Sequence, residues 1–337
     1  MAKVAIKDIA KMLHTSTATV SRALNDHPAI KKETREKVMK LVNEVGYRPN
    51  TIAKNLKMQR STTIGILVPN IGHDFFARAI SAIEKVVSDA GFTAMICQSH
   101  ENIHKEKEAV KTLIANRVAG VLASISQETT SPDHFRELQS HEIPVVFFDR
   151  CFDEGIAASK VITDDFSGSL RAVKYLIKTG YKRIACLAGT PNLNIARERL
   201  RGYKQALQEA GLTCHEKWIV PCGMEKQDGK IALQQLMQLD EKPDAIFCIN
   251  DPVAIGVYQQ LQVYKMKIPD DVAVIGFSNN EISALIQPAL TTVDQSAEKM
   301  GERAGQILIS QIQNKQEGIT GNTIEIMEAN LIVRDSA

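Results

Sequence analysis

The chain has 337 residues, of which 44% are hydrophobic and 24% charged, and its formal net charge is only +2. This composition excludes a largely disordered chain and predicts a globular protein of two or three domains. No run of 18 apolar residues occurs and no apolar leader opens the chain, so we expect a cytoplasmic protein with no membrane partner. The six cysteines form no CxxC pair, which favours reduced thiols over a disulfide framework or a zinc site.

Two short helices and a longer third one are predicted in the first 46 residues. Ile9, Ala10 and Leu13 fall on one face of the first helix, and a polar turn follows. Ser16 is a good N-cap for a second helix over residues 17–25. A third helix over 33–45 ends at Gly46, a residue suited to the position after a helix. Two short helices joined by a tight turn are typical of a helix-turn-helix, whose second helix lies in the major groove of DNA.

The charge is distributed unevenly along the chain. Residues 1–62 hold thirteen Lys and Arg against five Asp and Glu, a net charge of +8, so the remaining residues sum to about −6. A basic head on an acidic body is typical of a nucleic-acid-binding protein, because phosphate contacts supply most of the non-specific affinity. An ordinary three-helix domain with a solvated basic surface is the alternative reading, and the helix-turn-helix spacing favours DNA.

From residue 63 the chain alternates between strand-like and helix-like runs. The strands are short, apolar and bounded by turn residues, as buried parallel strands are. This alternation predicts doubly wound parallel sheets, and its restart near residue 167 predicts two similar lobes. The predicted strands are 63–69, 92–99, 119–124, 144–149, 160–165, 183–189, 218–222, 245–251 and 272–277, and the predicted helices are 75–90, 104–116, 167–179, 197–210, 228–239 and 252–264.

Nothing in this body indicates catalysis. The chain has no GxSxG, no GxGxxG after a strand, no Walker loop and no HExxH, and its eight histidines show no paired spacing. We therefore expect no enzyme, no catalytic residue, no cofactor and no metal. Asp164 and Asp165 end a strand, where α/β sheets bind ligands, and they are kept as ligand or hinge candidates.

Several motifs in the right order resemble one known family. The runs IKDIAKMLHTSTATVSRALN, TREKV and GYRPNTIAKNLKMQRSTTIGILVP are similar to the head of the lactose/galactose repressor (LacI/GalR) family of bacterial transcription regulators. The resemblance implies a helix-turn-helix head and a hinge helix, followed by a body like periplasmic sugar-binding proteins.

The resemblance also implies which residues of the head meet DNA. Arg22 is expected to read a guanine, because its guanidinium fork matches the O6 and N7 acceptors. Thr17 and Ala18 also match positions that meet base edges, whereas Ser16, Thr19 and Ser21 are phosphate candidates that could equally be caps or surface hydroxyls. Further DNA contacts are expected from the hinge segment at Asn50, Ala53, Leu56 and Lys57.

Leu56 is the prominent apolar residue of the hinge segment, which would be a marginal helix alone. In the family this helix folds in the minor groove and wedges a leucine into the central base step, an insertion that kinks the duplex. The alternative is that Leu56 packs on the head.

The resemblance implies the domain boundaries and a dimer. Near the end, residues 290–312 resemble the segment in which the chain crosses back to the first lobe. No leucine heptad tail follows, so a homodimer is expected rather than a coiled-coil tetramer. The expected domains are the head 1–48, the hinge and linker 49–62, lobe one over 63–162 and 292–322, and lobe two over 163–291 and 323–337.

A small effector is expected in the cleft between the lobes. Phe75 and Phe76 match aromatics that stack on effectors, although they could instead form the dimer-facing side of their helix. Arg197 matches the arginine that grips sugar hydroxyls or a carboxylate, while Arg199 and Arg201 could form surface pairs with Glu198. The other expected effector contacts are Asp149, Arg150, Met224, Asn250, Asp251, Ser278 and Asn279.

One departure leaves the effector open. Ser278 in IGFSNN stands where many sugar-responsive members carry an Asp, so the site cannot pair there with a cationic group. The leading hypothesis is a dimeric repressor of a sugar-utilisation operon that binds a pseudo-palindromic operator. A regulator that answers to a purine or a phosphosugar as corepressor is one alternative, and a solute-binding module without a DNA-regulatory role is the other.

Overall fold

A computed structural model describes residues 5–24, 26–47, 61–316 and 321–337. The chain divides into two compact units, residues 1–61 and 62–337. Over residues 5–24 and 26–47 the first unit contains three helices, which are α1 (Ile6–Met12), α2 (Thr17–Leu24) and α3 (Lys32–Glu44). Its small core is formed by apolar side chains from all three helices, namely Ile9, Ala10, Val20, Ala23, Val38 and Val42. The predicted helix-turn-helix is therefore present.

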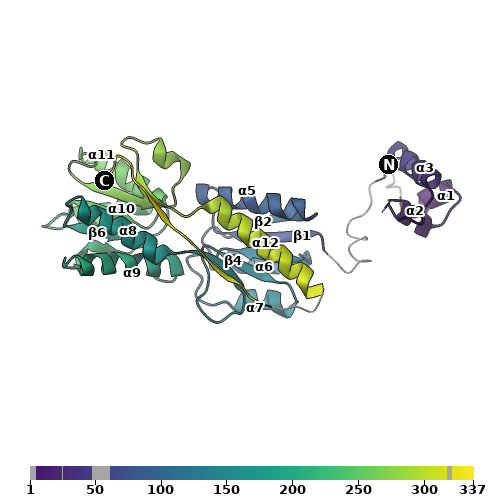
Figure 1. Ribbon diagram of the computed structural model, residues 1–337, viewed down its shortest axis with the longest axis horizontal. Helices are drawn as coiled ribbons and strands as arrows, with labels where there is room; N and C mark the ends of the chain where they lie inside the picture. Colours follow the sequence, from purple (N-terminus) through teal and green to yellow (C-terminus); the bar gives the residue numbers. More distant parts are fainter. Residues whose placement is uncertain (1–4, 25, 48–60, 317–320) are drawn as a thin grey trace. The chain divides into compact units, whose positions relative to one another are not determined.

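The second unit consists of two lobes, each built on one six-stranded sheet (Figure 1). In the first lobe the strand order is β11-β5-β4-β3-β1-β2, and the strands pair in parallel. These strands are β1 (Thr63–Val68), β2 (Thr93–Gln98), β3 (Gly120–Ala123), β4 (Val145–Phe148), β5 (Ser159–Thr163) and β11 (Ile324–Met327). The helices of this lobe are α5 (Asp74–Asp89), α6 (Ile103–Ala115), α7 (Asp133–Ser140) and α12 (Ala297–Gln316).

The second lobe repeats the plan with strand order β12-β10-β9-β8-β6-β7, in which β12 is the antiparallel edge. Its strands are β6 (Ile184–Leu187), β7 (Ile219–Val220), β8 (Ala245–Cys248), β9 (Ala273–Phe277), β10 (Thr291–Asp294) and β12 (Asn330–Ile332). Its helices are α8 (Asp165–Lys178), α9 (Asn194–Glu209), α10 (Lys226–Met237) and α11 (Asp251–Val263), with short 3-10 turns at η1 (Glu216–Trp218) and η2 (Glu281–Ala284). The predicted α/β body of two doubly wound lobes is confirmed.

Helices cover both faces of the first sheet. On one face, α5 and α12 pack together over Ile64, Ile66 and Val146, and Figure 1 shows the two helices side by side. Their close approach depends on Gly301, where an added Cβ would lie 2.3 Å from the carbonyl oxygen of Ala79. On the other face, α6 and α7 contribute Leu113 and Phe135. Burial on both faces explains why the strands read as continuous apolar runs.

The chain passes between the lobes at three places, and two of them differ from the sequence-based boundaries. The first passage, after β5, lies where it was expected. The second follows β10, so residues 292–294, which were expected in lobe one, belong to lobe two. The third divides residues 323–337, all expected in lobe two, because β11 pairs with β5 in lobe one and only β12 reaches lobe two. Helix α7 was also missed, since its eight residues are too few to show a clear helical period.

Candidate functional site

The first candidate site is the exposed face of α2. Thr17, Ala18 and Arg22 are all exposed, while Val20 and Ala23 of the same helix are buried in the head. The structure therefore leaves the three residues expected to meet base edges available on one surface of a helix-turn-helix.

Two hydroxyl residues beside this face, Ser16 and Thr19, make hydrogen bonds within the head. Ser16 Oγ accepts a hydrogen bond from the backbone N–H of Thr19 at 3.0 Å, which makes it the N-cap of α2. The hydroxyls of Ser16 and Thr19 also lie 2.9 Å apart, within hydrogen-bond distance. Ser21 is half-buried. The expected contacts at Asn50, Ala53, Leu56 and Lys57 lie outside the described residues.

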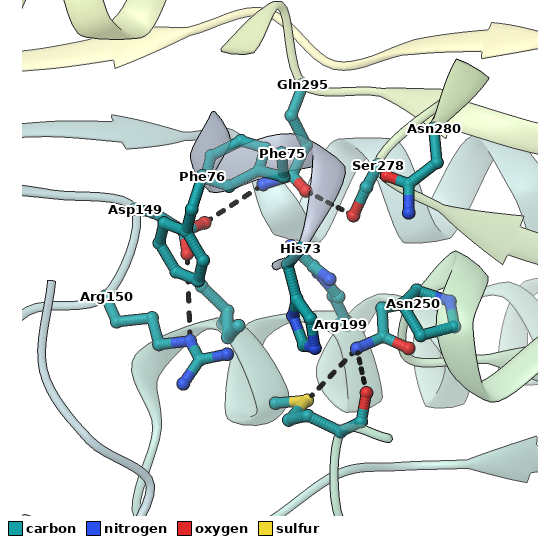
Figure 2. Close-up of a pocket in the computed structure, with 13 residues that line it drawn as sticks. His73, Phe75, Phe76, Asp149, Arg150, Arg199, Asn250, Ser278, Asn280 and Gln295 are labelled. Atoms are coloured by element: carbon teal, nitrogen blue, oxygen red, sulfur yellow. Dashed lines mark hydrogen bonds and ion pairs between the residues drawn. The ribbon is translucent and has the colours of Figure 1, made fainter. Parts of the chain in front are cut away.

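The second candidate site is a pocket between the two lobes that is partly open to solvent, and its empty volume of about 380 Å³ includes this open space (Figure 2). Its wall takes side chains from both lobes, and they are His73, Phe75, Phe76, Asp149, Arg150, Ile195, Arg199, Met224, Asn250, Pro252, Ser278, Asn280 and Gln295.

Aromatic rings form the wall on the side of the first lobe. Phe75 and Phe76 begin helix α5 and meet edge to face, with ring centroids 5.3 Å apart. The guanidinium of Arg150, at the end of β4, lies 5.6 Å from the centroid of Phe76. Both phenylalanines also belong to the core of lobe one, so the fold holds this apolar surface in place for a ligand ring.

Arg199, and not Arg197, is the arginine that reaches the pocket from α9. The Arg199 guanidinium is buried, donates from Nε to Asp165 at 2.7 Å, and lies 3.6 Å from the ring centroid of Phe277. Arg197 is not among the residues that line the pocket, and it pairs with Asp153 of the first lobe and donates to two backbone carbonyls. The expectation for Arg197 thus differs from the structure by two residues, because the helix turns position 199 inward and position 197 outward.

Arg199 and Arg201 of the same helix also have different partners. Arg201 forms the expected surface pair with Glu198, whereas Arg199 does not. The signal that could have identified Arg199 is its position on the apolar stripe of the helix, four residues after Ile195 and four before Tyr203, both of which are buried. A charged side chain on a buried stripe needs a partner, and Asp165 supplies it.

A chain of polar groups crosses the back of the pocket. Gln295, in the second passage between the lobes, donates to Asp149 Oδ1 at 3.1 Å and accepts from the Ser278 hydroxyl at 2.9 Å (Figure 2). Asp149 and Ser278 both have positive φ, at 60° and 121°. Strained backbone of this kind is common at ligand sites. Gln295 was missed in the sequence because a lone glutamine between a strand and a helix carries no pattern.

The expected contacts on lobe two divide into two groups. Asn250 and Met224 line the pocket, where the Asn250 amide donates to the Met224 carbonyl at 3.0 Å while its oxygen caps α11. Asp251 lies behind this wall, and its carboxylate accepts from Asn280 N, Ser283 and Thr292. Asn279 is also engaged elsewhere, with Arg78 and Arg334.

Burial shifts the titration of the carboxylates near the pocket. Desolvation raises the pKa of Asp149, although the positive charges of Arg150 and Arg199 act to lower it. Desolvation also raises the pKa of Asp165 to about 7, although Arg199 opposes the shift. Both groups are held close to cations because their charged forms would otherwise be too costly to bury.

A pH dependence of folding stability follows from Asp165. Because its pKa in the folded chain lies above the unfolded value, its contribution is fully present below about pH 4 and is lost as pH rises through 7. Between pH 5 and 8 we expect wild type to lose about 2–3 kcal/mol relative to Asp165→Asn, which cannot titrate. Urea unfolding of both proteins across this range measures the difference, and parallel pH profiles would contradict the assignment.

The fold and the two sites define a class of protein, a DNA-binding regulator with a ligand-binding body. The family described as "Bacterial regulatory proteins, lacI family" matches residues 5–50, and a "Periplasmic binding protein-like domain" matches residues 173–337. Among the described residues, no helix has both the length and the apolar character needed to cross a bilayer.

Known proteins resemble the chain along nearly its whole length. The HTH-type transcriptional repressor PurR of Vibrio atlanticus (strain LGP32) is 36% identical over 312 residues, which are 92% of each protein. The repressor of the same name from Proteus mirabilis (strain HI4320) is 33% identical over 323 residues, covering 95% of this chain and 93% of the relative.

Solved structures show the same fold. A complex of the transcriptional regulator CelR with cellobiose has a TM-score of 0.75 at 26% identity, covering 99% of this chain and 100% of that chain. A Lac repressor dimer bound to operator and the anti-inducer ONPF has a TM-score of 0.86 at 23% identity, with 99% of each chain covered.

The chain therefore belongs to the lacI family of bacterial regulatory proteins. It is a DNA-binding transcriptional repressor with an effector-binding domain and not an enzyme, which confirms the predicted class of function.

Proposed function

We propose that the repressor works in the cytoplasm as a homodimer on a pseudo-palindromic operator, and that its effector is an uncharged ring compound, either a sugar or a heterocycle the size of a purine base. The effector binds between the lobes and changes the operator affinity through its preference for one arrangement of the lobes. The observation that carries the effector proposal is a pair of buried polar atoms on the pocket wall. Oδ1 of Asn280 has no hydrogen-bond partner among the described residues, and Nε of Arg150 has only an ion-pair contact with Asp149 Oδ2 at 3.7 Å, which is beyond hydrogen-bond distance.

Such atoms favour a ligand that supplies both an acceptor and a donor. Unpaired buried polar groups are costly, so a bound molecule that satisfies them gains affinity and specificity. Ring hydroxyls or the edge of a heterocycle provide both kinds of group, and the rings of Phe75 and Phe76 provide an apolar face for the remainder.

The charges around the pocket favour an effector without a phosphate. Each pocket arginine already has its own carboxylate, since Arg150 donates to Glu101 at 2.7 Å and Arg199 pairs with Asp165. Asp149 adds a further carboxylate to the wall. A phosphorylated effector would bring one or two more negative charges into a buried site with no free cation to balance them.

A binding screen tests the effector proposal. The full chain is mixed with monosaccharides, cellobiose, purine bases and the phosphorylated counterpart of each, and thermal shift and operator affinity are recorded. We expect an unphosphorylated compound to raise the melting temperature and to change operator affinity, and its phosphorylated form to bind at least tenfold more weakly. Stronger binding of the phosphorylated member would contradict the proposed charge balance.

The dimer is supported by exposed apolar side chains on both lobes. Ile96 of the edge strand β2 is 49% exposed, and Leu285, just after η2, is 72% exposed. Large apolar groups left in water commonly mark an interface. We expect Leu285→Glu to weaken dimerisation at least tenfold in sedimentation equilibrium and to reduce operator affinity with it. Lys182→Glu, at an exposed position of lobe two that carries no apolar side chain, is the control and should remain dimeric.

A further inference from the structure

One carboxylate reaches across the mouth of the cleft from lobe two to lobe one. Glu225 is the N-cap residue of α10, and its Oε1 lies 3.0 Å from Nε2 of His73 and accepts from the Asn70 amide at 3.1 Å. Asn70 and His73 belong to the loop between β1 and α5 in the first lobe. Because a carboxylate only accepts hydrogen bonds, Nε2 of His73 carries the hydrogen in this contact.

The place of this contact connects it to the pocket. His73 lines the pocket (Figure 2), and its ring is stacked with Phe76 at an interplanar angle of 18°. On the other side, Met224, which immediately precedes Glu225, also lines the pocket. Glu225 itself and Asn70 are not among the pocket-lining residues. Glu225 therefore acts on the site through His73 and through the position of α10.

Two helix N-termini meet at this carboxylate. His73 is the N-cap residue of α5, and Glu225 is the N-cap residue of α10, where it forms a capping box with Asp228. The positive ends of both helix dipoles favour a negative charge here. The side chain of Glu225 is 49% exposed whereas that of His73 is 13% exposed, so the contact lies at the solvent edge of the cleft. A polar contact this exposed is weak and is readily opened.

We propose that Glu225, with Asn70 and His73, is a latch that holds the two lobes closed over the effector pocket. It is a positioning element, since Glu225 needs no contact with the ligand to set the fraction of time that the pocket is closed. A second charged pair, Arg197 with Asp153, crosses between the lobes in the same way and gives Arg197 a role in closure instead of ligand binding.

Two substitutions of Asn70 with opposite charges test the latch, because one should open it and the other should tighten it. In Asn70→Asp the oxygen that accepts from Gly72 N at 2.9 Å is kept, but a like charge faces Glu225 and should open the latch. In Asn70→Lys a cation faces Glu225 and should tighten it. Neither change should matter once Glu225→Gln has removed the negative charge.

Amide hydrogen exchange of the full chain, without any added effector, measures the result. We expect exchange in peptides covering residues 70–77 and 224–230 to be about threefold faster in Asn70→Asp and Glu225→Gln and about twofold slower in Asn70→Lys. Salt at 0.5 M should reduce these differences, because it screens exposed charges. Glu216→Gln is the matched control, since Glu216 pairs with Lys204 inside lobe two.

The latch is overturned if the two substitutions at position 70 change exchange in the same direction, if Glu225→Gln has no effect, or if Glu216→Gln has an equal effect. Peptides from β1 and β8 should be unchanged in every variant, and a change there would show a general loss of stability. No effector is used, so this outcome is separate from success or failure of the effector screen.

Discussion

Replacing Arg199 by alanine is expected to destabilise the effector-binding unit by about 3–5 kcal/mol at pH 8. Arg199 and Asp165 are both buried, with side chains 2% exposed, and their atoms lie 2.7 Å apart. Removing the guanidinium leaves the Asp165 carboxyl buried without its cation, so the carboxyl must either keep an uncompensated charge or take up a proton, and the contact with Phe277 is also lost. Urea unfolding of the full chain measures the loss, and the pocket of this variant should no longer respond to any effector found by screening.

A partner substitution and a matched control define the cause of this effect. Adding Asp165→Asn to the alanine variant should recover part of the stability, because the neutral amide needs neither a cation nor an added proton in the buried site. Arg197→Ala removes an arginine two positions earlier on the same helix, where the side chain is 41% exposed and pairs with Asp153. That variant should lose less than about 1 kcal/mol. Equal losses in the two alanine variants would refute the buried ion pair.

Replacing Arg22 by alanine is expected to reduce operator affinity at least tenfold and to relax base choice at one symmetric pair of positions. An arginine bidentate to guanine is worth about 1–3 kcal/mol of discrimination, and a dimer would lose two such contacts. Selection of bound duplexes from a random pool gives the operator of the wild type, and the same selection with the variant shows which positions have lost their preference.

The control removes one positive charge elsewhere. Lys299 is exposed on α12 of the effector-binding unit, so Lys299→Ala should leave both the selected sequence and the affinity nearly unchanged. If Arg22→Ala weakens binding to all sequences equally, Arg22 contacts phosphate rather than a base.

The sequence alone was sufficient to predict the architecture of this protein. The spacing of Ile9, Ala10 and Leu13, the cap at Ser16 and the basic charge of the first 62 residues predicted the helix-turn-helix, and the structure confirms its fold. Alternating apolar strands and helices predicted the two lobes. Such patterns are local, since a period of two or 3.6 residues and a capping side chain are visible within a few residues of chain.

The pocket depended on the tertiary structure. Phe75, Asp149, Met224, Asn250 and Ser278 could be placed near it because they follow the ends of predicted strands or match family positions, and the structure brings them together. Their role in binding stays a prediction. His73, Asn280 and Gln295 carry no signal of their own, because their significance comes from what the other lobe places opposite them.

Arg197 and Arg199 show most clearly what could not be predicted from the sequence. Both lie in one helix within two residues of each other, and composition cannot distinguish them. The helix rotation set by packing Ile195 and Tyr203 into lobe two turns Arg199 toward Asp165 and leaves Arg197 at the surface, facing Asp153. The sequence determined which elements form, through short-range periodicity and capping. Only tertiary packing decided which side chains from two separate lobes share one pocket, because that depends on contacts between residues far apart in the chain.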